Sequence, residues 1–265
     1  MSQTAVVSRD EAETPHRRDG ALRARIARRL VRYQLRRPLA LSPRRPMVSF
    51  SFDDPPLSAT VAGAAILEAA GLRGVFYVAS SLLGGSAHFG PYADWKDIER
   101  LAARGHEIGC HTYGHTDFAG HVADEVEDEI QRNAAAFAHH GLSTARTFAY
   151  PYGEVTRVAK TRLGSRFGLL RAIHAGVLTA GVDLNQAPAV AIEGPEAKAI
   201  GAKWLDVALA KSGWVIFYCH DVAEAPTEWG CTPEALIAIT ERVRKSAAEV
   251  VTISEGLRRL GVIDG

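Results

Sequence analysis

Four short polar motifs each follow an apolar, strand-like run of the sequence. They are SFDDPP from Ser51, CHTYGH from Cys110, YPYG from Tyr150 and CHD from Cys219. The carboxyl ends of parallel strands in an α/β barrel meet on one face, so we expect the four motifs to converge there. The convergence carries more weight than any of the motifs alone.

The most informative residue types in these motifs are two histidines and two adjacent acids. His111 and His115 lie four residues apart, a spacing that lets two imidazoles reach one cation. A carboxylate from Asp53 or Asp54 would complete a site of two imidazoles and one carboxylate, with positions left open for water or substrate. This ligand set predicts one divalent metal ion, and zinc is the ion we favour among several that it accepts.

Such a site polarises an amide carbonyl, but amide hydrolysis also needs a base for the attacking water and an acid for the leaving nitrogen. If one aspartate of the pair binds metal, the other is free to act as the base. His220, which arrives from a distant strand end, is the candidate acid. Taken singly, the acids could instead be a helix cap with its neighbour, and His220 a core histidine.

The elements that would position these motifs alternate between strand-like and helix-like patterns. The pattern predicts helices over residues 58–70 and 94–104, one through Val122–Phe137, and one that begins near Pro233. Seven or eight strand-helix units favour an α/β fold built as a (β/α) barrel over an open sheet. The expected strands are 48–52, 75–78, 107–110, 147–150, 169–172, 189–192, 215–219 and 250–253.

The charge distribution separates the beginning of the chain from the rest. Residues 1–46 carry 12 arginines, no lysine and 4 acids, a net +8, so the remaining residues carry −7 of the overall +1. We therefore divide the chain into a basic extension over 1–46 and one catalytic domain over 47–265.

Residues 20–37 of the extension read as a basic amphipathic helix closed by Pro38. The helix could touch an anionic membrane surface or a phosphate-bearing glycolipid, or it could pack on the domain or at a homodimer interface. Nucleic acid is the partner that we expect least, because no binding motif accompanies the charge.

Neither a long apolar run nor a secretory signal is evident, and the three cysteines are odd in number and widely spaced. These features predict a cytoplasmic protein without a disulfide framework. We expect Cys110 and Cys219 to be small apolar residues of the barrel wall.

The four motifs together, in this order and spacing, resemble the polysaccharide deacetylase family, also called the NodB homology domain or carbohydrate esterase family 4. The resemblance covers about residues 47–260. It implies a distorted or incomplete (β/α) barrel of about seven parallel strands, and a reaction that removes N-acetyl or sometimes O-acetyl groups from sugar polymers.

Carried over by position, the resemblance implies that Asp53 is the catalytic base and that Asp54, His111 and His115 bind the metal. It implies further that Thr112 steadies the loop between the two histidines, that the backbone N–H of Tyr152 binds the oxyanion, and that His220 is the general acid.

Two departures from the family pattern leave open questions. Ala149 stands where the family usually has an arginine that orients the catalytic aspartate, and we propose Arg171 as its replacement. The usual Asp-Trp motif that tunes the acid histidine is not evident, so Asp183 and Asp206 are only candidate partners for His220.

The expected substrate is an N-acetylglucosamine-type unit of an exopolysaccharide or of its lipid-linked precursor, in the manner of the bacterial holdfast and exopolysaccharide deacetylases. Such a precursor would put the enzyme at the inner face of the membrane. The alternatives are an amidase or deformylase that acts on a small molecule, and a glycan-binding module without catalysis.

Overall fold

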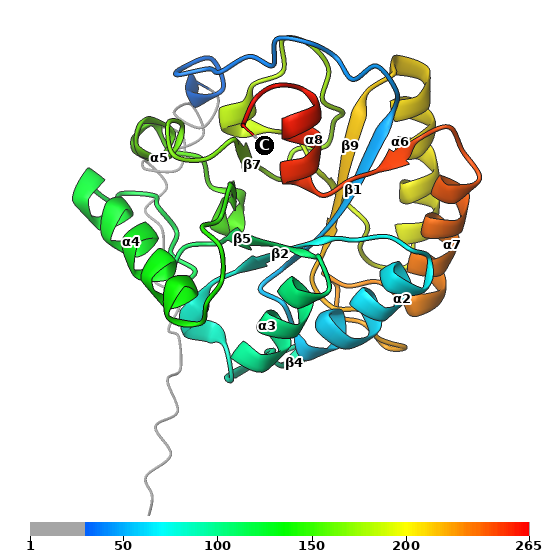
Figure 1. The fold of residues 1–265 in the computed structure, drawn as a ribbon, viewed down its shortest axis with the longest axis horizontal. Helices are drawn as coiled ribbons and strands as arrows, with labels where there is room; N and C mark the ends of the chain where they lie inside the picture. The colour runs from blue at the N-terminus through cyan, green and yellow to red at the C-terminus, as the bar shows by residue number, and fades with distance from the viewer. Residues whose placement is uncertain (1–29, 265) are drawn as a thin grey trace, which may run out of the picture.

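The computed structural model describes residues 30–264, and its main element is a curled sheet of parallel strands ringed by helices (Figure 1). The sheet order is β7-β6-β5-β2-β1-β9-β8, and β10 pairs with the beginning of β1. The strands are β1 Met47–Asp53, β2 Val75–Val78, β5 Glu107–Cys110, β6 Thr147–Ala149, β7 Leu169–Arg171, β8 Val190–Ala191, β9 Trp214–Cys219 and β10 Glu249–Val250.

The two edges of this sheet approach each other through the segment that precedes β8. Ala187 pairs in parallel with Arg171 of β7, and its N–H and C=O form 2.8 Å hydrogen bonds with Leu170 and Ala172. The predicted distorted barrel of about seven parallel strands is therefore confirmed.

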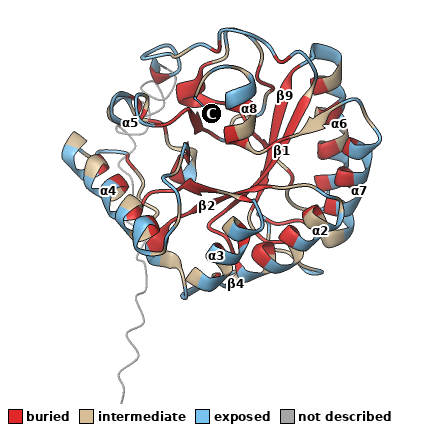
Figure 2. Ribbon diagram, in the orientation of Figure 1, coloured by how far each residue is buried: buried red, intermediate tan, exposed pale blue. Residues whose placement is uncertain are grey.

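The helices surround the sheet and cover its outer face (Figure 2). The interface is apolar because Phe50, Phe52 and Phe217 face it from the central strands and are at most 1% exposed. The helices are a π-helical turn η1 Ala59–Gly63 that continues into α2 Ala64–Ala69, α3 Trp95–Ala103, α4 Ala123–His139, α5 Arg157–Leu163, α6 Ala197–Lys211, α7 Pro233–Arg244 and α8 Ile253–Arg259.

Helix α8 closes the barrel at the amino ends of its strands. Leu257 packs with Met47 and Trp214, the first residues of β1 and β9. The Ser254 N–H and hydroxyl both donate to the carboxylate of Glu107, at 2.7 and 2.8 Å. The opposite end, where the strands finish, is left for the polar motifs.

Several sequence predictions need correction. Residues 250–253 do not form one strand, because β10 ends at Val250 and Thr252 caps α8 by accepting a hydrogen bond from the Glu255 N–H. Helices α5, α6 and α8 were not predicted. The small hairpin of β3 (Ser86–Ala87) and β4 (Gly90–Pro91) was also missed.

The predicted helix over 20–37 is wrong for its described second half. Leu30 and Val31 are helical, whereas residues 32–37 form turns and extended chain, and the part before residue 30 lies outside the described residues. The carbonyls of Val31 and Gln34 accept hydrogen bonds from Lys160 Nζ, and Leu35 adopts a left-handed backbone (φ 48°), so the helical pattern cannot continue. We call residues 30–46 the strap, and the domain boundary at residue 46 stays a prediction.

Candidate active site

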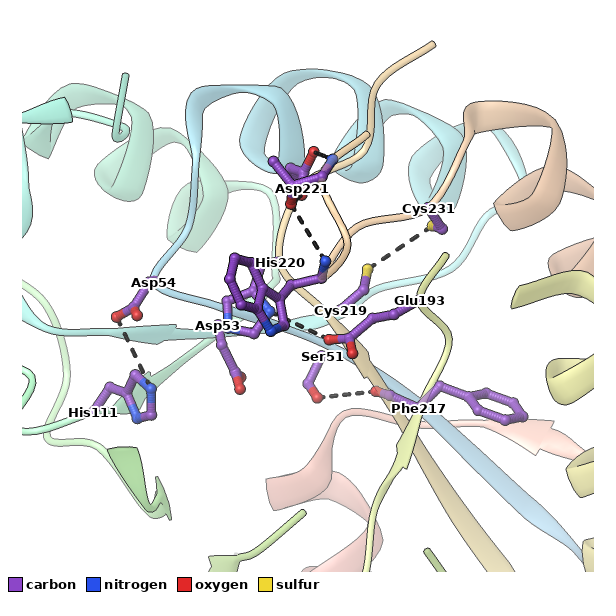
Figure 3. A network of polar contacts seen from close by, with 12 residues as sticks. Ser51, Asp53, Asp54, His111, Glu193, Phe217, Cys219, His220, Asp221 and Cys231 are labelled. Atoms are coloured by element: carbon purple, nitrogen blue, oxygen red, sulfur yellow. Dashed lines mark hydrogen bonds and ion pairs between the residues drawn. The ribbon is translucent and has the colours of Figure 1, made fainter. Parts of the chain in front are cut away.

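The polar motifs meet at the carboxyl ends of neighbouring strands. Asp53 ends β1, His111 follows β5 and His220 follows β9. The strand register aligns Phe52 with Cys219, one residue before each motif acid or histidine. Figure 3 shows Asp53, His111 and His220 gathered at this edge of the sheet.

Asp54, His111 and His115 form the candidate metal centre. One ligand atom from each lies within 4.8 Å of the others, and His115 Nε2 is 3.1 Å from Asp54 Oδ2. His111 Nδ1 is 2.8 Å from the backbone oxygen of Ala149. A proton on that nitrogen would leave Nε2 with its lone pair toward Asp54, 3.9 Å away.

The electrostatics of the centre suit a cation. Burial and the neighbouring His115 lower the pKa of His111 to about 3, and burial lowers the pKa of His115 to about 4, so both imidazoles are neutral and able to bind metal. Burial and the charge of Asp53 raise the pKa of Asp54 to about 7. Within residues 30–264, Asp54 Oδ1 is buried without a hydrogen-bond partner, as a ligand oxygen awaiting a cation would be. The residues present fit a divalent ion.

Left-handed backbone is concentrated around this centre. Among the described non-glycine residues with positive φ are four at the site, and such conformations cost about 1–3 kcal/mol each in functional sites. Two of these residues lie in the loop from His111 to His115. The Thr112 Oγ1 atom steadies this loop by accepting a hydrogen bond of 3.0 Å from the Thr116 N–H. The four are Asp54, Thr112, His115 and Tyr152.

Arg171 lies against Asp53, with its Nη2 atom 2.5 Å from Asp53 Oδ2. It stands on β7 directly opposite Ala149 of β6, so the guanidinium comes from the neighbouring strand at the level where the family arginine was expected. The rings of Tyr77 and Tyr218 lie 5.1 and 4.9 Å from its guanidinium carbon. Burial pushes the pKa of Asp53 upward, but the charge and hydrogen bond of Arg171, together with His111 and His220, outweigh burial and hold this pKa below its ordinary value.

His220 has a carboxylate partner that sequence reasoning missed. Its Nδ1 atom is 3.3 Å from Glu193 Oε1, and the two side chains face each other in Figure 3. Burial lowers the pKa of His220, but the hydrogen bond that Glu193 accepts and the charges of Asp53 and Glu193 raise it above its ordinary value.

The earlier candidate partners of His220 are wrong. Asp183 pairs with Lys160 at 2.7 Å, and Asp206 pairs with Arg242 on the outer face. Glu193 can be recognised as the partner of His220 only from the strand register, which pairs Val190 with Phe217 and Ala191 with Tyr218. Continued by two residues past β8, this register puts Glu193 beside His220.

Tyr152 lies in the 3-10 turn η3 Pro151–Gly153 after β6. The residue is 65% exposed, and its ring stands 4.4 Å from the ring of His115, measured between centroids. The residue is therefore next to the metal centre, while the role of its backbone N–H as an oxyanion donor stays a prediction.

The cysteines beside the site histidines are buried, free thiols, as expected for barrel-wall residues. Cys110 packs in the cluster under α4 and α5, and Cys219 in the core beneath α6 and α7. Cys219 Sγ lies 3.9 Å from Cys231 Sγ.

The sequence model described as polysaccharide deacetylase matches residues 40–168. Residues 40–168 therefore form a polysaccharide deacetylase domain. This domain makes the protein a deacetylase, a hydrolase, and the first three of the four motifs lie within the matched residues. No curated protein sequence matches the chain.

Solved structures with the same fold include other carbohydrate deacetylases and esterases. The Xyl-CE4 domain of a multidomain xylanase from the hindgut metagenome of Trinervitermes trinervoides is 18% identical, with a TM-score of 0.59 over 83% of this chain and 93% of that one. A family 4 acetyl xylan esterase from Clostridium thermocellum, in complex with a cobalt ion, is 22% identical, with a TM-score of 0.57 over 81% and 91%.

The chitin deacetylase of the fungal pathogen Colletotrichum lindemuthianum is 19% identical, with a TM-score of 0.57 over 81% of this chain and 89% of that one. At these identities the similarity establishes the shared fold. The shared fold covers 81% of this chain and therefore extends beyond residues 40–168.

Proposed function

We propose that the protein removes N-acetyl groups from amino sugars of the N-acetylglucosamine type and releases acetate. The observation that carries the proposal is the buried Asp54–His111–His115 centre with a charged base candidate, Asp53, and an acid candidate, His220, beside it. Binding a glycan without cleaving it would need neither of the last two groups.

The cofactor in this proposal is one divalent cation, preferably zinc, held by Asp54, His111 and His115. When bound, such an ion polarises the amide carbonyl and acidifies water. The acetyl xylan esterase of similar fold was solved with a cobalt ion, which supports a divalent-metal site in this barrel.

The protein's own residues divide the proton transfers. Asp53, kept ionised by Arg171, takes a proton from the attacking water as its oxygen bonds to the acetyl carbon. His220, kept protonated by Glu193, gives a proton to the amide nitrogen as the carbon–nitrogen bond breaks. The products are acetate and the free amine of the sugar. The Tyr152 backbone N–H would stabilise the charge on the carbonyl oxygen.

Aromatic side chains near the centre favour a sugar over a small amide. Trp229 is 40% exposed, and its backbone oxygen accepts a 2.9 Å hydrogen bond from the His220 N–H. Phe89 of the β3–β4 hairpin has its ring 6.5 Å from that of His220, and His88 packs on Trp229 at 4.8 Å. Together with Tyr152 these rings offer apolar faces around the reacting group, and aromatic side chains are common in the lining of ligand sites.

The substrate class agrees with the names of the similar structures, which include a chitin deacetylase and a peptidoglycan N-acetylglucosamine deacetylase. For this chain we propose an exopolysaccharide or its lipid-linked precursor as the substrate in the cell. A cytoplasmic location at the inner membrane face follows from that choice of substrate.

The strap offers the surface by which the enzyme would reach such a membrane. Leu30, Tyr33 and Leu41 are 53%, 80% and 66% exposed. Exposed arginines interleave with these apolar residues, a combination suited to anionic lipid: Arg32, Arg36, Arg44 and Arg45. No helix within residues 30–264 is long and apolar enough to span a bilayer.

The membrane contact is tested by sedimentation with vesicles that contain anionic lipid. The Tyr33→Ser, Leu41→Ser double variant should lose binding, whereas Ile237→Ser, a 43% exposed residue of α7, should not. Equal sedimentation of both variants would dismiss the membrane role and leave a homodimer contact, which gel filtration would detect. Point variants are preferable to deletion because Val31 and Leu39 of the strap are buried in the domain.

The function itself is tested by acetate release from N-acetylglucosamine oligomers. The zinc-reconstituted enzyme should release acetate, and the chelator-treated enzyme should not. A rate on small acetamides or formamides that exceeds the rate on oligomers would favour the amidase reading. Stoichiometric metal binding with no release from any of these substrates would favour a non-catalytic module.

A further inference from the structure

The loop that carries both candidate metal-binding histidines does not adopt a relaxed conformation by itself. Thr112 and His115 have φ of 65° and 54°, a left-handed region that side chains with a Cβ rarely occupy. Such a loop keeps its shape only when the surrounding structure holds it.

Glu129 of α4 holds the loop directly. Its Oε2 atom accepts hydrogen bonds from the N–H groups of Tyr113 at 3.1 Å and Gly114 at 2.7 Å, two of the three residues between the histidines. The side chain is only 13% exposed. Arg132, one turn away, lies 3.5 Å from Glu129 Oε1 and 4.1 Å from the centre of the Tyr113 ring.

Asn133, four residues after Glu129 on the same helix, holds the loop from its other side. It is fully buried, and its Oδ1 atom accepts hydrogen bonds from the N–H and hydroxyl of Ser80. Its Nδ2 atom donates to the Val78 oxygen at 3.0 Å. Ser81, the residue after Ser80, donates its N–H to the backbone oxygen of Tyr113 at 2.9 Å.

These contacts connect one helix face to the metal centre. Helix α4 runs along the outside of the barrel (Figure 1), yet Glu129 reaches the loop between His111 and His115, and Asn133 Nδ2 donates to the sulfur of Cys110, the residue before His111, at 3.3 Å. Other acids of α4 do not reach the loop. Asp128 is 65% exposed, and its contact is with Arg132 at 3.6 Å.

We propose that Glu129, supported by Asn133, is a positioning residue that sets the metal affinity of the site. It binds no metal and touches no reacting atom, and it acts by fixing the backbone between the two histidine ligands. Carboxylates that orient metal ligands from outside the coordination sphere typically contribute 10–100-fold to metal affinity. The inference rests on the proposed metal-dependent function.

The reach of the side chain, rather than its charge, should matter. A carboxamide oxygen at the same distance can still accept both N–H groups, so Glu129→Gln should preserve the loop. Glu129→Asp keeps the charge but is one methylene too short to reach both N–H groups. Glu129→Ala removes the acceptor, and Asp128→Asn is the matched control on the same helix.

The test is titration of each metal-free, full-length variant with Co²⁺, following the dissociation constant and the visible absorption of the bound ion. We expect Glu129→Ala to bind about 10–100-fold more weakly with an altered spectrum. The dissociation constant of Glu129→Asp should lie between those of wild type and Glu129→Ala. Glu129→Gln and Asp128→Asn should bind Co²⁺ about as tightly as wild type. The midpoint of thermal unfolding of the metal-free proteins separates a local effect from a folding defect.

Co²⁺ affinity and spectrum unchanged in both Glu129→Ala and Glu129→Asp would overturn the proposal. If Glu129→Ala does not fold, the contrast between the Gln and Asp variants still decides, because a charge effect predicts the reverse order. A wild-type protein that binds no Co²⁺ would refute the metal site and this inference together. Metal binding without acetate release would count against the proposed function alone.

Discussion

The Arg171–Asp53 pair at the site and the Lys160–Asp183 pair under the strap are both buried. They differ in how many of their polar atoms form hydrogen bonds. Lys160 Nζ donates to Asp183, to the Val31 oxygen and to the Gln34 oxygen, which occupies all its donors. Within residues 30–264, Arg171 Nε and Nη1 and Asp53 Oδ1 are buried without a partner. One pair is saturated and the other is not.

The difference distinguishes a buried charge that stabilises the fold from one that takes part in a reaction. Satisfied buried pairs hold two segments together, here the strap and the barrel, whereas unsatisfied polar atoms are unfavourable unless they serve a ligand or a reaction. The free oxygen of Asp53 is the one that would receive the proton of water. The following variants test whether stability and activity divide between the pairs in this way.

The largest expected effect on stability belongs to the saturated pair. Lys160→Met leaves the Asp183 carboxylate buried without its cation, which should lower the free energy of unfolding by about 3–5 kcal/mol. Urea denaturation of the metal-free protein measures this loss. Acetate release per folded molecule should stay within a few-fold of wild type, and a loss of activity as large as that of the site variants would break the distinction.

For the unsaturated Arg171–Asp53 pair we expect a large loss of activity and a smaller loss of stability. In Arg171→Met, burial acts on Asp53 without the opposing guanidinium, so the pKa of this carboxyl rises and the base is protonated more readily. We expect kcat/KM to fall by about 100-fold or more, with its acidic limb moved to higher pH. The loss of stability should be smaller than for Lys160→Met. Wild-type kcat/KM in this variant would rule out Arg171 as the replacement for the family arginine.

Sequence reasoning succeeded where local patterns determine the structure. Asp53, His111 and His220 each follow an apolar strand, and parallel strand ends meet, so convergence could be foreseen. Arg171 could be proposed because it ends a strand, although its match with Ala149 depends on the register between β6 and β7.

The misses have physical reasons. Glu193 lies just past β8, a strand of two residues, and only pairing with β9 brings it to His220. Residues 30–37 of the strap were expected to be helical, as part of a helix over 20–37, because the spacing of the apolar residues allows a helix. The distant Lys160 instead captures its carbonyls, a tertiary contact that no local pattern contains.

The smallest expected effect on activity comes from changing Glu193, the partner of the candidate general acid His220. Glu193→Gln removes an interaction that raises the pKa of His220, so His220 should lose its proton at lower pH. The alkaline limb of the kcat/KM profile should move to lower pH, with near-normal rates where His220 is still protonated. The loss should be less than the roughly 10²–10⁴-fold value of a complete acid.

The matched control is Glu196→Gln, an exposed acid three residues further along. It should leave the pH profile unchanged. Identical profiles for both variants would show that Glu193 does not tune His220.

The most direct test of the account is Asp53→Asn assayed beside wild type, with bound metal and acetate release measured on the same samples. We predict that the variant retains one equivalent of metal, because Asp54, His111 and His115 are intact, while acetate release falls by about 10²–10⁴-fold. Acetate release at the wild-type rate from the metal-loaded variant would contradict the assignment of Asp53 as the base and the mechanism built on it.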